Sequence, residues 1–550
     1  MIERVLNRIE SQRISPPQWI SGFVGILFIR FLFESLASPT RAGLLTSNSI
    51  TLVHYGLFWT TLILGLILII GFFSKNYLST SKIALFGLPI IWVAPIVDII
   101  ISRGSGYTQS YILDTGQRLV IDFFTFFGPT LTWGATYGIR LEILIVLLGT
   151  GWYLRRMGKN VLQILVGLIS VYLLGFILAS WPAILYTLSH IHNQASTLPD
   201  IYNYFGKIIF KSTISHNTIY EGSASLSLSR FFELTFDKFA AQVLFIVSFF
   251  LCGFLFWKID KKKFLSITQN IRLERIGSYL ALLVCGMGFA YINKLGNQIA
   301  WIDLVGIVCL IISWIGLWMY AVHNNDIADI KIDEISNTER PLIKKEVSEK
   351  EMKETAYLWL SAALLGSWCA GFYPFFMSLI YISASHLYSS PPLRLRQFPI
   401  ISSFLIAVAS LATVFAGFFF ISIDKHVQAF PMLLAFGIVI MVTLAINVKD
   451  MKDIEGDKTN GVMTLPILFG ENGPKIVGIC FALSFLLVPI FLSFYYLYIL
   501  AIPASIVGYR LVTKKPYKED PIFILRFIFL SCVAIVYGGI LWLANTYYIQ

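Results

Sequence analysis

The chain has 550 residues, of which 57% are hydrophobic and 13% are charged. Apolar runs of about 20 residues, each long enough to cross a bilayer, recur along its whole length and exclude a water-soluble globular fold. A net charge of +11 would suit nucleic acid, but the basic residues lie in short loops, where they orient helices in a membrane. We therefore expect an all-α polytopic membrane protein that binds no nucleic acid.

The amino-terminal half contains about six apolar runs of this length. Membrane-spanning helices are expected near residues 17–38, 51–73, 83–102, 135–154, 161–186 and 239–258. The first of them has no small-residue cleavage site before it and is expected to remain as an anchor. The apolar stretch 114–133 is interrupted by Gly128 and Pro129, which favours an interfacial or re-entrant piece.

Several ionisable residues lie in or beside these amino-terminal runs. Arg30 and Glu34 are four residues apart in the first run, and Asp98, Arg140 and Glu142 lie in or near later ones. Charged groups at such depths are candidates for transport or catalysis. A paired structural role, for example in docking this half against the other, is the favoured interpretation.

Histidine and cysteine give little sign of metal or disulfide chemistry. His190, His192 and His216 fall in a long polar loop and are expected to be exposed loop residues rather than metal ligands. The six cysteines all lie in apolar runs without CxxC spacing, so we expect buried thiols.

A run of lysines at 258–263 marks the expected domain boundary, which divides the chain into residues 1–262 and 263–550. Beyond it we expect nine more helices. They lie near residues 275–293, 300–322, 356–373, 374–389, 398–420, 427–447, 474–492, 493–511 and 522–543. Basic residues concentrate in alternate loops, and by the positive-inside rule this predicts a cytoplasmic amino terminus and an external carboxyl terminus.

Two acidic stretches in this second half have the same internal spacing. Asn325–Asp333 and Lys449–Asp457 each follow an apolar run, and each contains three aspartates at i, i+3 and i+7. On a helix this spacing places the three carboxylates on one face. The aspartates are Asp326, Asp329, Asp333, Asp450, Asp453 and Asp457.

Clustered carboxylates at a membrane interface repel one another unless cations neutralise them. Carboxylate oxygens that leave room for phosphate oxygens are typical of Mg²⁺ sites, so a diphosphate is the expected ligand. Basic neighbours Arg340, Lys344 and Lys458 are candidates to bind the same oxygens. The alternative for either stretch alone is a solvated charged surface.

The two stretches also resemble the aspartate-rich signatures of the UbiA superfamily of intramembrane prenyltransferases. The similarity includes Arg340 and Pro341 after the first stretch, and the pattern from Gly456 to Pro466 in the second. It covers roughly residues 264–550 and implies a nine-helix UbiA-like bundle. It leaves the preceding helices without a recognised family.

What the resemblance implies is Mg²⁺-dependent prenyl transfer. An isoprenyl diphosphate would be the donor, and the acceptor would be an aromatic quinone precursor or a glycerophosphate, both lipid-soluble or amphipathic partners. The first three aspartates would bind one Mg²⁺ with Asn325 supporting the diphosphate, and the last three a second Mg²⁺. For Asn325 the alternative role is that of a helix cap.

A third signature lies at His386–Pro399, where Tyr388 is similar to the family's tyrosine. The lysine that often follows four residues later is replaced by Pro392, so Arg394 or Arg396 would bind phosphate, or would simply set topology. Phosphoribosyl transfer to a polyprenyl phosphate by the same fold, a membrane transporter and a scaffold remain open alternatives.

Overall fold

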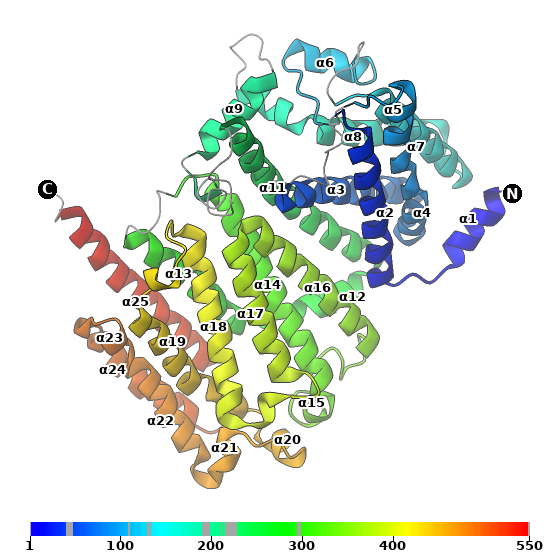
Figure 1. The fold of residues 1–550 in the computed structure, drawn as a ribbon. Coiled ribbons are helices and arrows are strands. Elements are labelled where there is room, and N and C mark those ends of the chain that lie inside the picture. The colour runs from blue at the N-terminus through cyan, green and yellow to red at the C-terminus, as the bar shows by residue number, and fades with distance from the viewer. Residues whose placement is uncertain are drawn as a thin grey trace. The chain divides into compact units, whose positions relative to one another are not determined.

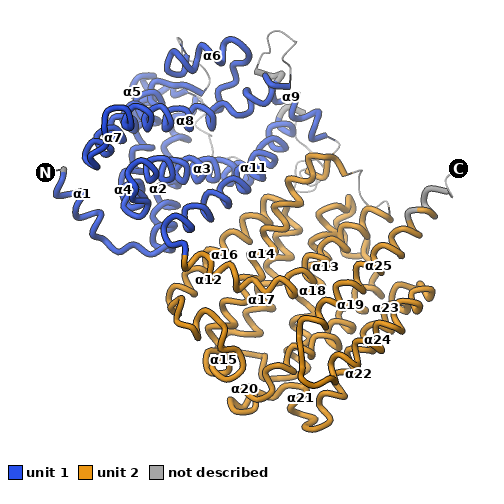
Figure 2. Tube along the Cα trace, turned by 180° about the vertical axis from the view of Figure 1, so that it is seen from behind, with its two compact units in different colours: residues 1–210, 225–261 blue, residues 211–224, 262–550 orange. Residues whose placement is uncertain are grey.

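The computed structural model describes residues 2–39, 48–107, 110–128, 134–189, 198–210, 212–214, 228–293 and 299–547. Regular structure in these ranges is helical throughout, with 3₁₀ turns between the longer helices (Figure 1). The chain forms two compact units, residues 1–210 with 225–261 and residues 211–224 with 262–550 (Figure 2). The prediction of an all-α polytopic membrane protein is confirmed.

Unit 1 contains the six predicted amino-terminal spans within its described residues. Its helices are α1 (Ile2–Ser11), α2 (Pro16–Ala37), α3 (Ser49–Ser74), α4 (Tyr77–Gly87), α5 (Val93–Ile101), α6 (Gln117–Phe124), α7 (Tyr137–Arg156), α8 (Val161–Ser189), α9 (Leu198–Ile209) and α11 (Leu228–Ile259). Helices α2, α3, α7, α8 and α11 are each long and apolar enough to cross a membrane. The sixth span is α4 joined to α5 by a 3₁₀ turn, Leu88–Trp92, which contains Pro89.

The interrupted stretch 114–133 does not form a spanning helix. Its helix, α6, covers eight residues, or about 12 Å, less than half the hydrocarbon thickness. Pro129 lies outside the described residues, as do His190, His192 and His216. All six cysteines are free thiols, as expected, but only Cys309 and Cys369 are buried. Cys285, Cys480 and Cys532 are partly exposed and Cys252 is exposed, so the prediction of buried thiols is wrong for these four, because apolar helices also carry thiols on their outward faces.

Among the ionisable residues singled out in this half, Arg30, Glu34 and Glu142 pair with one another, whereas Asp98 and Arg140 bond to backbone groups. Arg30 lies 3.3 Å from a carboxylate oxygen of Glu34 and 3.2 Å from one of Glu142. Asp98 accepts a 2.9 Å hydrogen bond from the backbone N–H of Gly138. These partners all belong to unit 1.

The described part of unit 2 contains a helix at each of the nine predicted spans, and seven of these are long and apolar enough to cross a membrane; the third and fourth are not among the candidate spans. The nine helices are α13 (Leu273–Ile292), α14 (Asp303–Ala328), α16 (Glu349–Ala370), α17 (Phe372–Ser389), α18 (Pro399–Ile421), α19 (Met432–Ala445), α22 (Gly473–Leu486), α24 (Tyr498–Thr513) and α25 (Asp520–Tyr547). The short helices α15 (Ile330–Ser336), α20 (Ile454–Thr459) and α21 (Leu465–Leu468) lie at one end of this bundle (Figure 1). Two further short helices are α12 (Lys261–Gln269) and α23 (Val488–Phe491).

Helices α13 and α18 cross at a reciprocal pair of glycines. A Cβ atom on Gly286 would lie 2.0 Å from the carbonyl oxygen of Val414, and one on Gly417 would lie 2.0 Å from that of Leu283. In a membrane there is no water to drive helices together, so small residues that allow close backbone contact stabilise the crossing. This crossing forms part of the wall of the bundle interior.

Gly417→Ala should therefore destabilise the bundle by about 1–3 kcal/mol, because the backbones must move apart. The measurement is the thermal unfolding midpoint in detergent. Gly277→Ala in α13 is the matched control, since its Cβ would meet no atom within 4 Å. Equal midpoints for the two variants would contradict the proposed close crossing.

Candidate functional site

The first aspartate stretch lies across a helix end rather than along one helix. Asp326 is in the last turn of α14, Asp329 terminates that helix, and Asp333 is in α15. The prediction that one continuous helical face carries all three is wrong. The backbone at Asp329 has φ −106° and ψ 15°, outside the α-helical region, and α15 continues from there as a separate short helix.

The second stretch repeats this arrangement. Asp450 lies in a 3₁₀ turn, Ile446–Met451, that extends α19. Asp453 precedes α20 with φ −100° and ψ 9°, and Asp457 lies within α20. Each stretch is therefore two short helical pieces joined at its middle aspartate, which lets the three carboxylates face different partners.

The two stretches meet where α15 packs against α20. Gly456 of α20 makes this approach possible, because a Cβ there would lie 2.5 Å from the Ser336 hydroxyl oxygen and 3.0 Å from the Ile332 carbonyl oxygen. A side chain at position 456 would separate the two helices. The close approach brings segments more than 100 residues apart in sequence into one site.

Arginine and asparagine side chains hold the first stretch. Asp326 accepts hydrogen bonds of 2.5 Å from Arg272, 2.9 Å from Arg340 and 2.8 Å from Asn270. Arg340 also pairs with Asp333. Both carboxylates are almost fully buried, so these contacts offset the cost of removing them from water.

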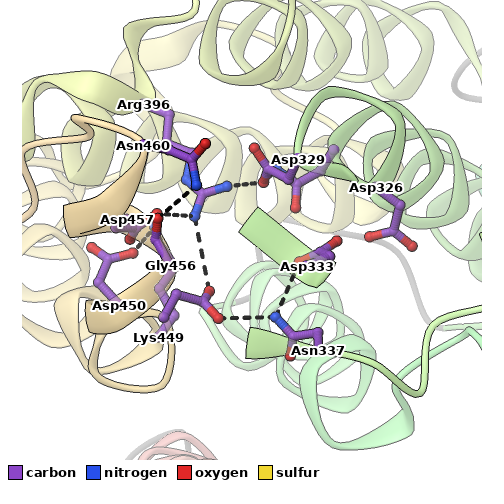
Figure 3. A network of polar contacts seen from close by, with 12 residues as sticks. Asp326, Asp329, Asp333, Asn337, Arg396, Lys449, Asp450, Gly456, Asp457 and Asn460 are labelled. Carbon is purple, nitrogen blue, oxygen red and sulfur yellow. Dashed lines mark hydrogen bonds and ion pairs between the residues drawn. The ribbon is translucent and has the colours of Figure 1, made fainter. Parts of the chain in front are cut away.

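Arg396 connects the two stretches. Its guanidinium pairs with Asp329, lies 3.0 Å from Asp457 and lies 3.8 Å from Asp453 (Figure 3). The side chain is 5% exposed. A buried guanidinium between carboxylates of both stretches fixes their separation as well as neutralising charge.

A second, uncharged link runs through Asn337. Its side-chain amide donates a 3.0 Å bond to Asp333 and a 2.9 Å bond to Asp453 (Figure 3). Burial raises the pKa of Asp333 to about 7, with Arg340 opposing the shift and neighbouring carboxylates adding to it. Burial likewise raises the pKa of Asp457 to about 6. The site therefore favours additional positive charge.

The donor set fits Mg²⁺ in its chemistry. It consists of carboxylate oxygens, and Oδ2 of Asp457 is buried without a hydrogen-bond partner. Throughout the described ranges, no three histidine, cysteine or acidic side chains are grouped as a metal site. In this conformation guanidinium groups occupy the space between the carboxylates, as the Arg396 contacts show.

A cavity of about 120 Å³ opens next to the aspartates. Asn325, Tyr388 and Lys449 form one end of it, and the first and last of these directly precede Asp326 and Asp450. Tyr279 and Tyr381 line the interior, with their ring centroids 5.6 Å apart. The cavity therefore joins the polar site to the apolar interior of the bundle.

The structure brings most, but not all, of the predicted ligand-binding residues to this site. The side-chain amide of Asn325 donates a 2.6 Å hydrogen bond to the Asp329 carboxylate, and the Arg394 guanidinium lies 2.8 Å from the same carboxylate. Tyr388 accepts a 2.7 Å bond from Lys449. Lys344 instead pairs with Glu339, and Lys458 is exposed.

Five polar residues of the site were not predicted as ligands. Asn337 lies between the first stretch and Arg340, so its position next to a signature was an available signal. The others are Asn270, Arg272, Lys449 and Arg526. The first two contact Asp326 from more than 50 residues away in the sequence, with the long helices α13 and α14 between. Spacing within a single stretch of sequence does not identify such residues.

Replacing Arg396 with glutamine should lower the thermal unfolding midpoint in EDTA, because buried Asp329 and Asp457 lose their shared cation. Breaking a buried ion pair typically costs about 3–5 kcal/mol. Lys458→Gln removes an exposed charge and should change stability by no more than about 0.5 kcal/mol. Equal midpoints in the two variants would contradict the linking role of Arg396.

Comparison with known proteins finds relatives for most of unit 2. The model of the UbiA prenyltransferase family matches residues 279–533. Digeranylgeranylglyceryl phosphate synthase of Thermococcus kodakarensis is 32% identical over 165 residues, which is 29% of this chain and 55% of that protein. Chlorophyll synthase of Avena sativa is 30% identical over 237 residues, or 39% and 60%. The chain thus spans a little over half the length of these two relatives.

Among solved structures, a UbiA homolog from Archaeoglobus fulgidus bound to DMAPP and Mg2+ aligns with a TM-score of 0.40 and 18% identity. The alignment covers 50% of this chain and 99% of that one. The family match spans the helices that carry both aspartate stretches and the cavity. Residues 279–533 of this chain are a UbiA prenyltransferase family domain.

Proposed function

We propose that this protein transfers a prenyl group from an isoprenyl diphosphate to a lipid-soluble or amphipathic acceptor, with Mg²⁺ as cofactor. The acceptor is an aromatic ring of the quinone-precursor kind or a glycerophosphate. Residues 263–550 form the transferase domain, and residues 1–262 form a separate transmembrane domain.

The observation that carries this proposal is the charge of the cavity beside the aspartates. The described lining includes four basic side chains, Arg272, Arg275, Lys449 and Arg526, and no acidic one. The first three pair with Asp326, Glu519 and Asp450, which lie outside the lining, so the basic groups rather than the acids border the cavity. A cationic cavity attracts an anionic ligand. Its apolar interior suits a prenyl chain, so one molecule with a diphosphate and a hydrocarbon tail satisfies both parts.

The six aspartates are the residues that would hold Mg²⁺, with one ion for each stretch in the proposed arrangement. The ion supplies positive charge to the departing diphosphate. The orphaned oxygen of Asp457 and the raised pKa of Asp333 support an added cation here. Arg394 and Arg396, which now neutralise Asp329, are placed to bind diphosphate oxygens instead.

The chain's own groups account for the remaining steps. The bond between the allylic carbon and the diphosphate oxygen breaks, and the diphosphate leaves with the electron pair. Lys449 and Tyr388, hydrogen-bonded to each other, orient and stabilise it. The rings of Tyr279, Trp318 and Tyr381 line the cavity and stabilise positive charge on the prenyl carbon. The acceptor then forms a new bond to that carbon and loses a proton.

The names of the relatives support an acceptor that is either a glycerophosphate or an aromatic ring compound. They include digeranylgeranylglyceryl phosphate synthases, chlorophyll synthases and, at 25% identity, homogentisate phytyltransferase 1 of Arabidopsis thaliana. Arg526 lies on α25, at a distance in sequence from both aspartate stretches, and lines the same cavity. A guanidinium there favours an acceptor with an acidic group.

The asymmetry of loop charge supports a location in the cell membrane, with the amino terminus and active site on the cytoplasmic side. The carboxyl terminus would then lie outside. An odd number of crossings would put the two termini on opposite sides, and both the six plus nine predicted spans and the 13 candidate spans of the described residues are odd in number.

Purified protein in nanodiscs, given Mg²⁺ and labelled geranylgeranyl diphosphate, should form a prenylated product from pooled quinone-precursor aromatics and glycerol phosphates. Asp329→Ala and Asp453→Ala should each reduce the rate by about 100-fold or more, since electrostatic stabilisation of a leaving group is worth several kcal/mol. Mass spectrometry identifies the product and its acceptor together.

Two controls make the assay decisive. EDTA should abolish turnover and excess Mg²⁺ should restore it, while Lys458→Gln, an exposed residue, should retain most of it. Folded protein that neither binds the donor nor releases diphosphate would overturn prenyl transfer. Transfer from a phosphoribosyl donor to a polyprenyl phosphate would replace it.

The orientation is tested separately by cysteine labelling of intact cells. A single cysteine placed at exposed Lys458, in the short helix α20, should be protected from an impermeant maleimide until the membrane is permeabilised. A cysteine at exposed Val427, at the opposite end of α19, should react at once. The reverse pattern would place the active site outside.

A further inference from the structure

Unit 1 contains a cavity of its own, of about 140 Å³. Helices α2, α3, α7 and α8 contribute most of its walls, and all four are candidate membrane spans. A protein cavity of about 150 Å³ holds one benzene molecule. The space therefore suits a ligand with a body of roughly one aromatic ring.

Its charge is opposite to that of the cavity in unit 2. The charged residues in the lining are Arg30, Glu34 and Glu142, so with all three ionised it has one more negative charge than positive. Arg30 is 2% exposed, whereas the side chains of Glu34 and Glu142 are 13% and 10% exposed. The carboxylates, rather than the guanidinium, thus present accessible surface to the cavity.

The arginine is also committed to other contacts. Its guanidinium donates to the carbonyl oxygen of Ile91, pairs with both glutamates and lies 5.2 Å from the ring centroid of Trp59. These contacts restrict Arg30 to the wall of the cavity. An excess negative charge within a membrane-spanning region is costly unless a cation accompanies it.

Aromatic side chains form much of the remaining wall. They are Tyr55, Phe58, Trp59, Tyr111, Phe127 and Tyr172. Faces of such rings attract ammonium groups, most strongly where water is excluded. Carboxylates combined with an aromatic enclosure constitute a site for an organic cation.

A neighbouring buried network fixes one of these rings. Tyr111 Oη lies 2.6 Å from Nε2 of His54, whose Nδ1 lies 2.9 Å from Asp237. Thr51 donates a 2.6 Å bond to the other oxygen of Asp237. The Asp237 carboxylate is thus engaged by His54 and Thr51, and Tyr111 is held in a single orientation.

We propose that the cavity of unit 1 binds a small organic ammonium ion, with the ammonium group on the cavity side of the Glu34 and Glu142 carboxylates and an apolar body of about one ring against the aromatic wall. This inference concerns a different unit from the transferase site and does not depend on prenyl transfer.

The test uses the full-length protein in nanodiscs and calorimetric titration with three probes of one shape, benzylammonium, benzyl alcohol and benzoate. Benzylammonium should bind at least about tenfold more tightly than the alcohol, as expected for a charge-assisted contact, and benzoate should not bind. Equal binding of ammonium and alcohol would mean an apolar or lipid-chain site, and no ammonium binding would mean that a proton neutralises the carboxylates. Either result overturns the proposal.

Two variants locate the binding. Glu34→Gln leaves the balanced Arg30 and Glu142 pair and should weaken benzylammonium binding by about tenfold or more. Glu233→Gln should not, because this half-buried side chain pairs with Arg230 and does not line the cavity. Gly175 lines the cavity and has open space at its Cβ, so Gly175→Leu should fill the cavity and abolish binding.

Gly149→Leu is the matched control for the cavity-filling variant, since Gly149 also has open space at its Cβ, is exposed and lies on α7. Thermal unfolding verifies that each variant is folded. Unchanged binding in folded Gly175→Leu would overturn the proposal even if Glu34→Gln failed to fold. Because binding is read without turnover, failure of prenyl transfer would leave this result intact.

Discussion

The carboxyl-terminal unit depends on the placement of six aspartates at one end of an apolar bundle. Such carboxylates repel one another, and burial makes the repulsion stronger. The chain opposes it with guanidinium groups from separate elements, of which Arg396 contacts both stretches. In the proposed function, the groups that stabilise this conformation would also bind the diphosphate, because both tasks need guanidinium groups beside the carboxylates.

This arrangement depends on a helix boundary at the middle aspartate of each stretch, Asp329 and Asp453. A continuous helix would hold three carboxylates in one row. Helix α14 ends at Ala328 and α15 begins at Ile330, so Asp329 between them can pair with Arg394 and Arg396. Asp326 and Asp333 share Arg340. The close approach at Gly456 then joins this half of the site to the other.

The two cavities illustrate how composition of the lining selects a ligand. Both have a largely apolar and aromatic interior, but one has four basic groups without an acid and the other has two acids with one arginine. In a low-dielectric setting a single unbalanced charge has a large effect on what binds. The first cavity therefore suits an anion with a hydrocarbon tail, and the second a compact cation.

The sequence by itself determined the membrane class, the number and approximate bounds of the long helices, and the identity of the aspartates. Apolar length and loop charge are local properties, and repeated spacing is visible without a fold. Only the tertiary structure decided how the aspartates are partnered, because Asn270, Arg272 and Arg396 reach them from other helices and loops. It also decided which aromatic residues enclose each cavity, since hydropathy is the same for a ring that faces lipid and a ring that faces a ligand.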